Sequence, residues 1–313
     1  MNSPLSPADR YRGAIWGQFV GDAAGLGTHW IYDLNDRAAK YPEGVEGFEA
    51  PLPGHYHEGK RSGDFTHYGD AALLLLESIA ALGQFEEIDF GQRFIDFFTD
   101  PACTCYKDHS TRETLNNLKA RPGDFQNGAD DDQPATVSRL APLVVAYMNA
   151  DDAKFFDAVE RCTRFSQHNP IAQDYAKAHA MILRSLLRGT DMGAALEEAR
   201  LTVDNRYTAD IIESALALGQ QDVITTTQHF GQTCPLPSSF PSTVHAAARH
   251  GGSYHEAILE TIRAGGDNAG RASMAGAWLG AFHGVVGIPP EWKSQLTQHA
   301  RIEAAVEKLV AGP

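Results

Sequence analysis

The sequence is poor in basic residues. Its 313 residues include 26 Lys and Arg against 40 Asp and Glu, so the formal net charge is −14 at pH 7 and the pI is near 5.3. Nucleic-acid backbones and anionic membrane surfaces are held by clustered Lys and Arg side chains, which this chain lacks. The composition therefore excludes general nucleic-acid and membrane binders, and a phosphate on a ligand would depend on local donors.

Cysteine and long apolar runs are also scarce. The four cysteines, at positions 103, 105, 162 and 234, form neither a Cys-x-x-Cys pair nor a zinc-finger spacing. We interpret them as buried, inert thiols in a reducing compartment. No apolar stretch approaches the length of a membrane span, and residues 1–10 lack the apolar core of a signal peptide. These absences predict a soluble, cytoplasmic protein.

Segments with the alternating polarity of strands are nearly absent, and residues 222–230 are the best strand candidate. Helical spacing of apolar residues is common, and no Pro/Gly/Ser-rich linker divides the chain. We therefore predict a single all-α domain over residues 1–313. The expected helices cover residues 7–26, 70–82, 88–98, 134–148, 153–165, 171–187, 192–202, 208–218, 242–250, 254–264, 271–286 and 300–310.

Two of these predicted helices carry a small residue at every fourth position. The first stripe is Gly13, Gly17, Gly21 and Gly25, and the second is Ala272, Gly276, Gly280 and Gly284. Each glycine in a helix costs about 1 kcal/mol relative to alanine, so such stripes indicate the close approach of another backbone. We predict that the two helices cross closely and bring Asp22 and Asp267 into one central region.

The stretch before the second stripe, Gly265-Gly266-Asp267-Asn268-Ala269-Gly270-Arg271, is typical of a tight turn that leads into a helix. Asp267 and Arg271 are four residues apart, and a local ion pair is the plain interpretation of that spacing. The alternative is that Arg271 binds a carboxylate or phosphate of a ligand.

A second polar stretch, residues 63–70, precedes an apolar helix. Thr66 and Asp70 are suited to cap that helix, although the same oxygens could bind a hard cation or a sugar hydroxyl. The segment before it, residues 27–64, is irregular and contains prolines and several histidines. An irregular segment of this length is usually functional, and we predict a lid or a pocket wall.

Three motifs together resemble the ADP-ribosylglycohydrolase family, over residues 10–295. They are Gly17-x-x-x-Gly21-Asp22-Ala23-x-Gly25, Ser166-Gln167-His168-Asn169-Pro170, and Gly265-Gly266-Asp267 followed by Gly276-Ala277-x-x-Gly280-Ala281 and Ile288-Pro289-Pro290-Glu291-Trp292. The resemblance implies a single-domain orthogonal helical bundle with a central cleft. In active members, that cleft holds two magnesium or manganese ions and cleaves the bond between ADP-ribose and a modified side chain.

This chain departs from the family at its metal motifs. Thr-Asp-Asp-Thr is replaced by Thr66-His67-Tyr68-Gly69, and Gly-Gly-Asp-Thr-Asp-Thr by Gly265-Gly266-Asp267-Asn268-Ala269-Gly270. Thr66 and Asp267 alone keep the residue that the family uses as a metal ligand. Because a pair of hard cations needs several carboxylates, we predict at most one weakly bound Mg²⁺ on Thr66 and Asp267. The altered pattern is similar to the branch that contains the J1 crystallins and selenoprotein J.

Two functions are consistent with this pattern. The first is hydrolysis of an N- or O-glycosidic bond of ADP-ribose or a related ribosyl compound, at a remodelled, metal-poor site. A carboxylate pair can supply the acid and base without metal. The predicted acid/base groups are Asp267, Asp70 and Asp22. The predicted substrate contacts are Asn268, Arg271, Tyr68, His67, His168 and Arg139, with His67 and His168 also as proton carriers.

The second function is that of a catalytically inactive descendant, either crystallin-like or ligand-binding, because most metal ligands of the family are missing. Replacement of Arg271 by alanine separates the two, since only a working site would lose affinity or turnover. A metal-free lyase or transferase acting on a small polar metabolite is a third alternative. The partner expected of an enzyme is a small-molecule or ribosylated substrate.

Overall fold

A computed structural model describes residues 5–312 of the chain. In this range it contains no β-strand, only two isolated bridges, between Ile31 and Gly266 and between Ala129 and Gln167. The predicted all-α class is confirmed. The α-helices are α1 Pro7–Gly25, α2 Leu34–Lys40, α3 His67–Leu82, α4 Glu87–Thr99, α5 His109–Ala120, α6 Ala141–Ala146, α7 Asp152–Ser166, α8 Pro170–Leu187, α9 Met192–Thr202, α10 Arg206–Ala217, α11 Val223–Phe230, α12 Leu236–Arg249, α13 Tyr254–Arg263, α14 Asn268–His283, α15 Pro290–Gln295 and α16 His299–Ala311, and the 3₁₀ helices are η1 Leu26–Thr28, η2 Val137–Arg139 and η3 Val285–Gly287.

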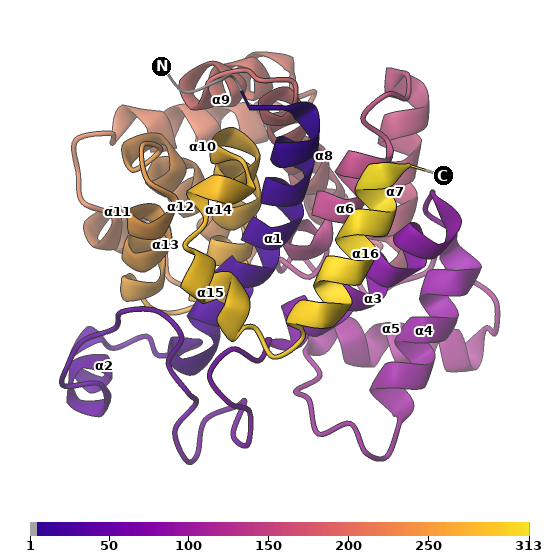
Figure 1. The fold of residues 1–313 in the computed structure, drawn as a ribbon, viewed down its shortest axis with the longest axis horizontal. Helices are drawn as coiled ribbons and strands as arrows, with labels where there is room; N and C mark the ends of the chain where they lie inside the picture. The colour runs from indigo at the N-terminus through magenta and orange to yellow at the C-terminus, as the bar shows by residue number, and fades with distance from the viewer. Residues whose placement is uncertain (1–4, 313) are drawn as a thin grey trace.

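The fold is centred on the crossing of α1 and α14, which lie side by side through the middle of the molecule (Figure 1). A Cβ placed on Gly17 would lie 2.1 Å from the carbonyl oxygen of Gly276, and one on Gly13 would lie 2.0 Å from that of Gly280. No side chain fits at such separations, because the two backbones are in direct contact. The predicted close crossing of two small-faced helices is confirmed.

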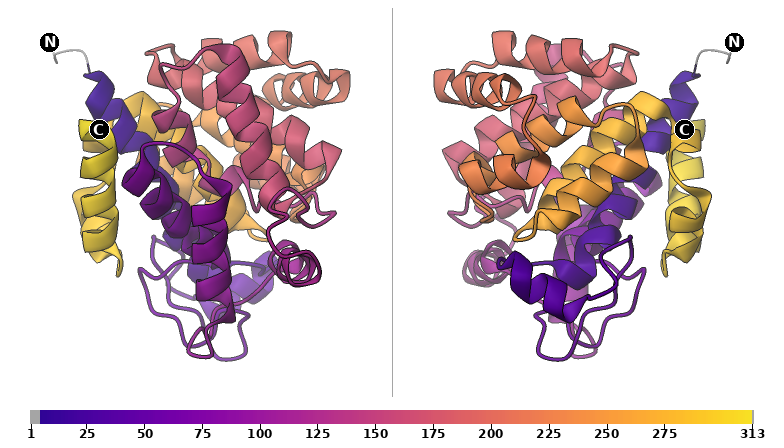
Figure 2. Two further views of the ribbon diagram at one scale, coloured as in Figure 1. Left: turned by 90° about the vertical axis from the view of Figure 1, so that its right-hand side faces the viewer. Right: turned by 90° about the vertical axis from the view of Figure 1, so that its left-hand side faces the viewer.

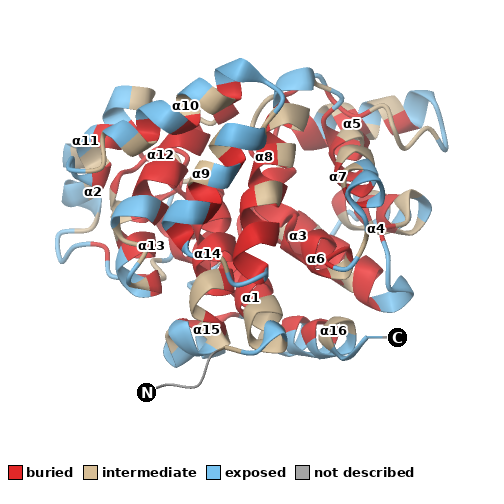
Figure 3. Cartoon of the chain, turned by 90° about the horizontal axis from the view of Figure 1, so that it is seen from above, coloured by how far each residue is buried: buried red, intermediate tan, exposed pale blue. Residues whose placement is uncertain are grey.

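Other helices enclose this pair. Helices α8, α12 and α13 pack on α14, whereas α3 and α16 pack on α1 and on each other. Coloured by burial, α1, α14 and α3 form a buried centre, and the outer helices expose their outward faces (Figure 3). None of the helices in residues 5–312 is both long and apolar enough to span a membrane.

The segment between α1 and α3 is mostly irregular and extends from one end of the bundle (Figures 1 and 2). It contains the short helix α2, which has no buried residue and begins where Asp33 accepts hydrogen bonds from the backbone of the first turn. The sequence did not indicate this helix, since it has no apolar face. The irregular character predicted for residues 27–64 otherwise agrees with the structure.

The strand predicted for residues 222–230 is wrong, because this segment forms helix α11. Its isoleucine, valine and threonines favour strands by intrinsic propensity. However, the Asp222 side chain accepts a hydrogen bond from the Thr225 amide and caps a helix. Val223, Thr226 and Thr227 are then buried together, so helical spacing decides which side chains pack.

The interpretation of all four cysteines as inert thiols is also wrong in part. Cys103 and Cys105 form a disulfide in the turn region between α4 and α5, and both are half-buried. Cys162 is a buried free thiol, as expected, and Cys234 is half-buried. A Cys-x-Cys pair gives no recognised sequence signal, and the local backbone conformation, with the two Cα atoms 5.5 Å apart, is what lets the two sulfur atoms meet.

Candidate functional site

The site begins at the inner end of the α1–α14 crossing, where Asp22 of α1 meets the start of α3. Asp22 is 1 % exposed, and its Oδ2 accepts a hydrogen bond of 2.8 Å from the Thr66 amide while Oδ1 accepts from the Thr66 hydroxyl. Burial raises the pKa of Asp22 to about 6. A Cβ on Gly69 would lie 2.3 Å from Oδ2 of Asp22, so glycine at this position leaves room for the carboxylate. Asp22 thereby fixes α1 to the first turn of α3.

Asp267 stands at the start of α14, after two glycines with positive φ angles, Gly265 and Gly266. It is fully buried, and its Oδ1 lies 3.5 Å from the Tyr68 hydroxyl and 3.6 Å from Nε2 of His29. Oδ2 has no hydrogen-bond partner among residues 5–312. Burial raises the pKa of Asp267 to about 6. This carboxyl group is therefore the more open of the two to chemistry.

Arg271 does not pair with Asp267. Its guanidinium group donates to the backbone carbonyls of Gly265 and of Gln232, the latter at 3.4 Å, and no ion pair of 4 Å or less links it to Asp267 in the described chain. The predicted local ion pair is therefore not formed. Arg271 is 1 % exposed, and its position stabilises the turn that precedes α14.

Asn268 lies beside Asp267 and holds a neighbouring imidazole. Its Nδ2 donates to the hydroxyl of Thr28 at 2.7 Å and to the carbonyl of Ile262 at 3.2 Å, which fixes the amide orientation. Its Oδ1 then faces Nδ1 of His29 at 3.3 Å. Asn268 is thus a buried residue that orients His29, and its predicted contact with substrate stays a prediction.

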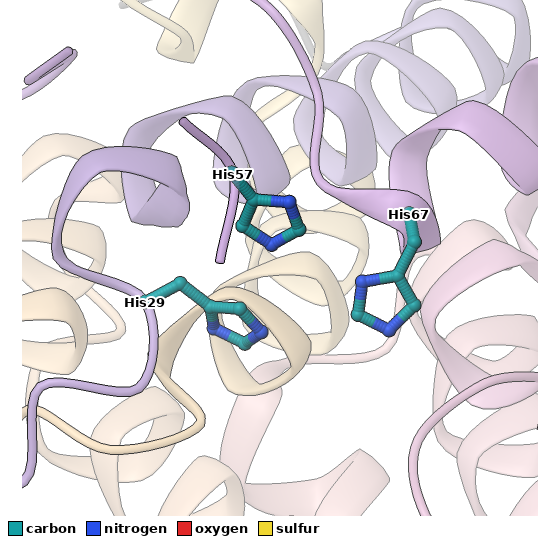
Figure 4. A group of neighbouring side chains, drawn as sticks. All are labelled: His29, His57 and His67. Atoms are coloured by element: carbon teal, nitrogen blue, oxygen red, sulfur yellow. The ribbon is translucent and has the colours of Figure 1, made fainter. Parts of the chain in front are cut away.

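Three histidines meet beside Asp267. His29 follows η1, His57 lies in the irregular segment, and His67 is the first residue of α3, yet one ligand atom from each lies within 4.8 Å of the others. Figure 4 shows the three rings arranged around a common space, with a nitrogen of each ring turned toward it. We call His29, His57, His67, Tyr68 and Asp267 the buried polar cluster.

His67 was named as a site residue from the sequence, whereas the other two were noted only as histidines of an irregular segment. No spacing along the chain marks the three as a set, because 27 residues lie between His29 and His57 and a turn separates His57 from His67. Burial lowers the pKa of His29 and of His57, so both rings are neutral at neutral pH. The tertiary fold alone brings them together.

Aromatic side chains cover the cluster on the side of the irregular segment. Trp30 stacks on His57 with ring centroids 5.6 Å apart, and Tyr56 and Tyr106 contact Trp30 edge-on. Trp30 has a φ angle of 62°, and it is the one non-glycine residue with positive φ in residues 5–312. Such backbone strain is often stored at functional sites. We call Trp30, Tyr56 and Tyr106 the aromatic cover.

The central cleft expected from the resemblance is closed around the cluster. All five cluster side chains are at most 2 % exposed. The prediction that residues 27–64 form a lid or pocket wall fits this arrangement, because both Trp30 and His57 come from that segment. Tyr56, by contrast, is 64 % exposed and lies at the surface of the cover.

The remaining predicted residues lie outside the cluster. Asp70 forms an ion pair of 2.6 Å with Lys60 and lines a separate pocket of about 270 Å³. Arg139 is buried near Phe90 and donates to the hydroxyl of Ser166. His168 is exposed at the surface. The structure therefore does not join Asp70, Arg139 or His168 to Asp267.

The metal ligands that the resemblance implies do not fit Mg²⁺ here. The Thr66 hydroxyl donates to Asp22 and accepts from the Tyr68 amide at 3.1 Å, so its proton and one of its two lone pairs are occupied. The groups nearest Asp267 are an imidazole and a phenol. Mg²⁺ requires an octahedral shell rich in oxygen. The donors present around Asp267 are dominated by nitrogen, and they disagree with the expectation of a magnesium site.

Comparison with known proteins agrees with the motifs in the sequence. The family profile described as ADP-ribosylglycohydrolase matches residues 3–313. Crystallin J1A of Tripedalia cystophora is 26% identical over 96% of both chains. The mouse (Mus musculus) ADP-ribosylhydrolase ARH3 is 22% identical and covers 96% of this chain and 90% of its own. A solved structure, described as an ADP-ribosylglycohydrolase-related protein complex, is 24% identical with a TM-score of 0.76 over 97% of this chain and 98% of its own, which shows the shared fold.

Proposed function

The chain belongs to the ADP-ribosylglycohydrolase family, and from this premise we propose that it hydrolyses an N- or O-glycosidic bond of an ADP-ribose conjugate or a related ribosyl compound. The observation that carries the proposal is Asp267, a fully buried carboxyl group whose Oδ2 has no hydrogen-bond partner among the described residues. A carboxyl group held in this way is suited to proton transfer. The site therefore supports acid–base cleavage without magnesium.

In the proposed reaction, Asp267 donates a proton to the leaving oxygen or nitrogen as its bond to the ribosyl C1 breaks. Water then adds to C1 of the oxocarbenium-like centre and returns a proton to the Asp267 carboxylate. The products are the free ribose hemiacetal and the alcohol or amine. The Tyr68 hydroxyl, 3.5 Å from Oδ1, orients the carboxyl group during both steps.

Asp22 has a supporting role in this proposal. Both of its carboxylate oxygens accept hydrogen bonds from Thr66, so neither oxygen is free to reach a substrate. It acts as a positioning residue that sets the start of α3, and with it Tyr68. Of the predicted acid/base groups Asp267, Asp70 and Asp22, the proposal therefore keeps Asp267 for proton transfer and Asp22 for support.

Substrate reaches Asp267 when the aromatic cover moves. The turn that carries Tyr56 and His57 lies between Gly54 and Gly59, which have positive φ angles and no heavy atom within 4 Å of a built Cβ. Movement of this turn would separate His57 from Trp30 and from the other two histidines. The proposed enzyme thus opens its lid to bind substrate and closes it around the substrate and the reacting water.

The alternative is a ligand-binding or crystallin-like protein without turnover. Two observations favour it: the 26% identity to Crystallin J1A over nearly the full length, and the complete burial of the cluster. In that case the cluster would serve the stability of the fold, and opening of the cover would have no role.

The test is hydrolysis of ADP-ribosylated arginine and of a chromogenic riboside by wild type, Asp267→Asn and Glu303→Gln. Glu303 is an exposed carboxylate on α16 and serves as the matched control. We expect the asparagine variant to lose about 10²- to 10⁴-fold in turnover, which is the usual contribution of a general acid or base. Equal turnover in Asp267→Asn contradicts the proposed role of Asp267, and absence of turnover by wild type on both substrates favours the non-catalytic alternative.

A further inference from the structure

We propose that His29, His57 and His67 bind one first-row transition-metal ion, such as Zn²⁺. One ligand atom of each histidine lies within 4.8 Å of the others, and all three side chains are at most 2 % exposed. In Figure 4 each ring turns a nitrogen toward the space between them. Three imidazoles converging on one point are a common donor set for zinc and related metals.

The lack of hydrogen bonds to several ring nitrogens supports the binding of an ion between the rings. Nε2 of His29 and both ring nitrogens of His57 and His67 are buried without a hydrogen-bond partner among the described residues. A buried polar atom left unpaired is unfavourable. Nε2 of His67 and Nε2 of His29 lie at ion-pair distance from Asp108 and Asp267, which leaves Nδ1 of His67 and both nitrogens of His57 with neither a hydrogen bond nor an ion pair among residues 5–312. A metal ion at their centre would satisfy one nitrogen of each ring.

The ring nitrogens that face away from the common space have polar neighbours of the kind found around metal-bound histidines. Nδ1 of His29 faces Oδ1 of Asn268 at 3.3 Å, and Nε2 of His67 faces Oδ2 of Asp108 at 3.5 Å. Asp108 is itself fixed by the Thr111 amide at 2.8 Å. Imidazoles that ligate metals usually donate their second N–H to a carboxylate or carbonyl, which orients the ring. Two of the three histidines have this support.

Asp267 lies beside the three histidines but outside the set of mutually close ligand atoms. Its Oδ1 lies 3.6 Å from Nε2 of His29, so the carboxylate offsets part of the metal charge in a buried site. Two ligands of a tetrahedral zinc ion with bonds of about 2.0–2.1 Å are separated by about 3.3 Å, so the three imidazoles move toward one another when the ion binds.

The nitrogen-rich donor set disfavours Mg²⁺, the ion that the family resemblance implies. Imidazole suits zinc, copper, iron and nickel, whereas magnesium takes oxygen ligands. The replacements that remove the magnesium motif therefore coincide with a set of donors for a different class of metal. This inference goes beyond the proposed function, because metal binding requires neither turnover nor substrate.

A bound ion would also link three parts of the chain. His29 lies beside the start of α14, His57 belongs to the segment under the aromatic cover, and His67 begins α3. Coordination would hold the covering segment to the helical core. An ion bound only to the folded chain stabilises it by an amount that grows with the logarithm of the metal concentration, so metal should raise the thermal midpoint.

The test uses the metal-stripped full chain, titrated with Co²⁺ by visible absorption and with Zn²⁺ and Mg²⁺ by calorimetry. We expect one Co²⁺ or Zn²⁺ per chain and no Mg²⁺ binding. His57→Ala should weaken Zn²⁺ binding by at least about 100-fold, and Asn268→Ala by about 10- to 100-fold, as for supporting residues in other metal sites. His168→Ala, which changes an exposed histidine, should bind as wild type does.

His57 lies outside the helices, so circular dichroism should show unchanged helix content in His57→Ala and confirm that the variant is folded. Substoichiometric binding by wild type, equal affinity in wild type and His57→Ala, or preference for Mg²⁺ would each overturn the proposal. Because the titration contains no substrate, a failure of the metal site is distinguishable from a failure of the hydrolase activity.

Discussion

The two ends of the α1–α14 crossing differ in character. At the outer end, Gly13 and Gly17 meet Gly280 and Gly276 with direct contact of the backbones. At the inner end, buried polar side chains such as Asp267 meet residues from α3 and from the irregular segment. Backbone contact continues to the inner end, where a Cβ on Gly21 would lie 2.1 Å from the carbonyl oxygen of Ala272. There, however, polar partners from elsewhere in the chain are added to it.

This contrast explains how the molecule retains unpaired polar atoms in its core. The glycine contacts leave the two backbones no freedom to shift, so the inner end cannot relax to pair every polar group. The unpartnered nitrogens and oxygens around Asp267 are therefore held in place by the packing of the crossing, which reaches Ala269 and Ala272 in the same helix. A rigid scaffold of this kind is what positions a functional site.

The largest expected effect is that of a methyl group at the outer end. In Gly17→Ala, the new Cβ would lie 2.1 Å from the Gly276 carbonyl oxygen, and backbone must move to accommodate it. We expect the free energy of unfolding in urea to fall by about 3 kcal/mol. Gly252→Ala, at an exposed position with no atom within 4 Å, is the control and should change it by less than about 0.5 kcal/mol. Equal effects in the two variants would show that the crossing tolerates side chains.

A buried histidine that lies outside the buried polar cluster tests how an unpaired imidazole makes the free energy of unfolding depend on pH. His179 of α8 packs against Trp278 of α14, and burial lowers its pKa to about 3. Since the unfolded chain binds a proton near pH 6.5 and the folded chain does not, stability is lost as pH falls below 6.5. Between pH 7 and 5, wild type should lose about 2 kcal/mol relative to His179→Leu. A difference in unfolding free energy that is constant with pH would contradict this assignment.

At the inner end, Thr66 caps α3 and holds Asp22. Thr66→Ala removes the hydroxyl that accepts from the Tyr68 amide and donates to Asp22, and it should cost about 1–2 kcal/mol in chemical unfolding. Thr66→Ser keeps the hydroxyl and is the matched variant. If the serine variant loses as much as the alanine variant, the methyl group rather than the hydrogen bonds stabilises this end.

The smallest effect is expected at the surface beside the outer end. Arg12 of α1 and Glu307 of α16 form an exposed ion pair of 2.6 Å. Glu307→Gln should lower the unfolding free energy by about 0.5 kcal/mol, and the loss should disappear at high salt because exposed charges are screened. A loss that persists at high salt would indicate that the hydrogen bonds, rather than the charges, link α16 to α1.

Local signals in the sequence were sufficient for much of the fold. The glycine stripes predicted the α1–α14 crossing because only backbone contact explains glycine at every fourth helical position. Helical spacing predicted most helices, and the motifs predicted the family. The failures were local too: the β-branched residues of α11 favoured a strand, and α2 and α5 lack an apolar face long enough to be recognised.

The candidate site was predictable in part. Asp267 and Tyr68 were named from the motifs, and the structure places them 3.5 Å apart. Asp70 and Arg139 were also named, but their side chains pair with Lys60 and Ser166. The direction of a side chain depends on packing between elements, which a motif does not encode.

The sequence by itself therefore determined the helical class, the family and the contact between the two ends of the chain. These properties rest on the periodicity and the local conformational limits of each segment. Only the tertiary structure decided that His29, His57 and His67 meet beside Asp267 under an aromatic cover. Their meeting depends on how an irregular segment closes over the helices, and no local rule of spacing fixes that closure.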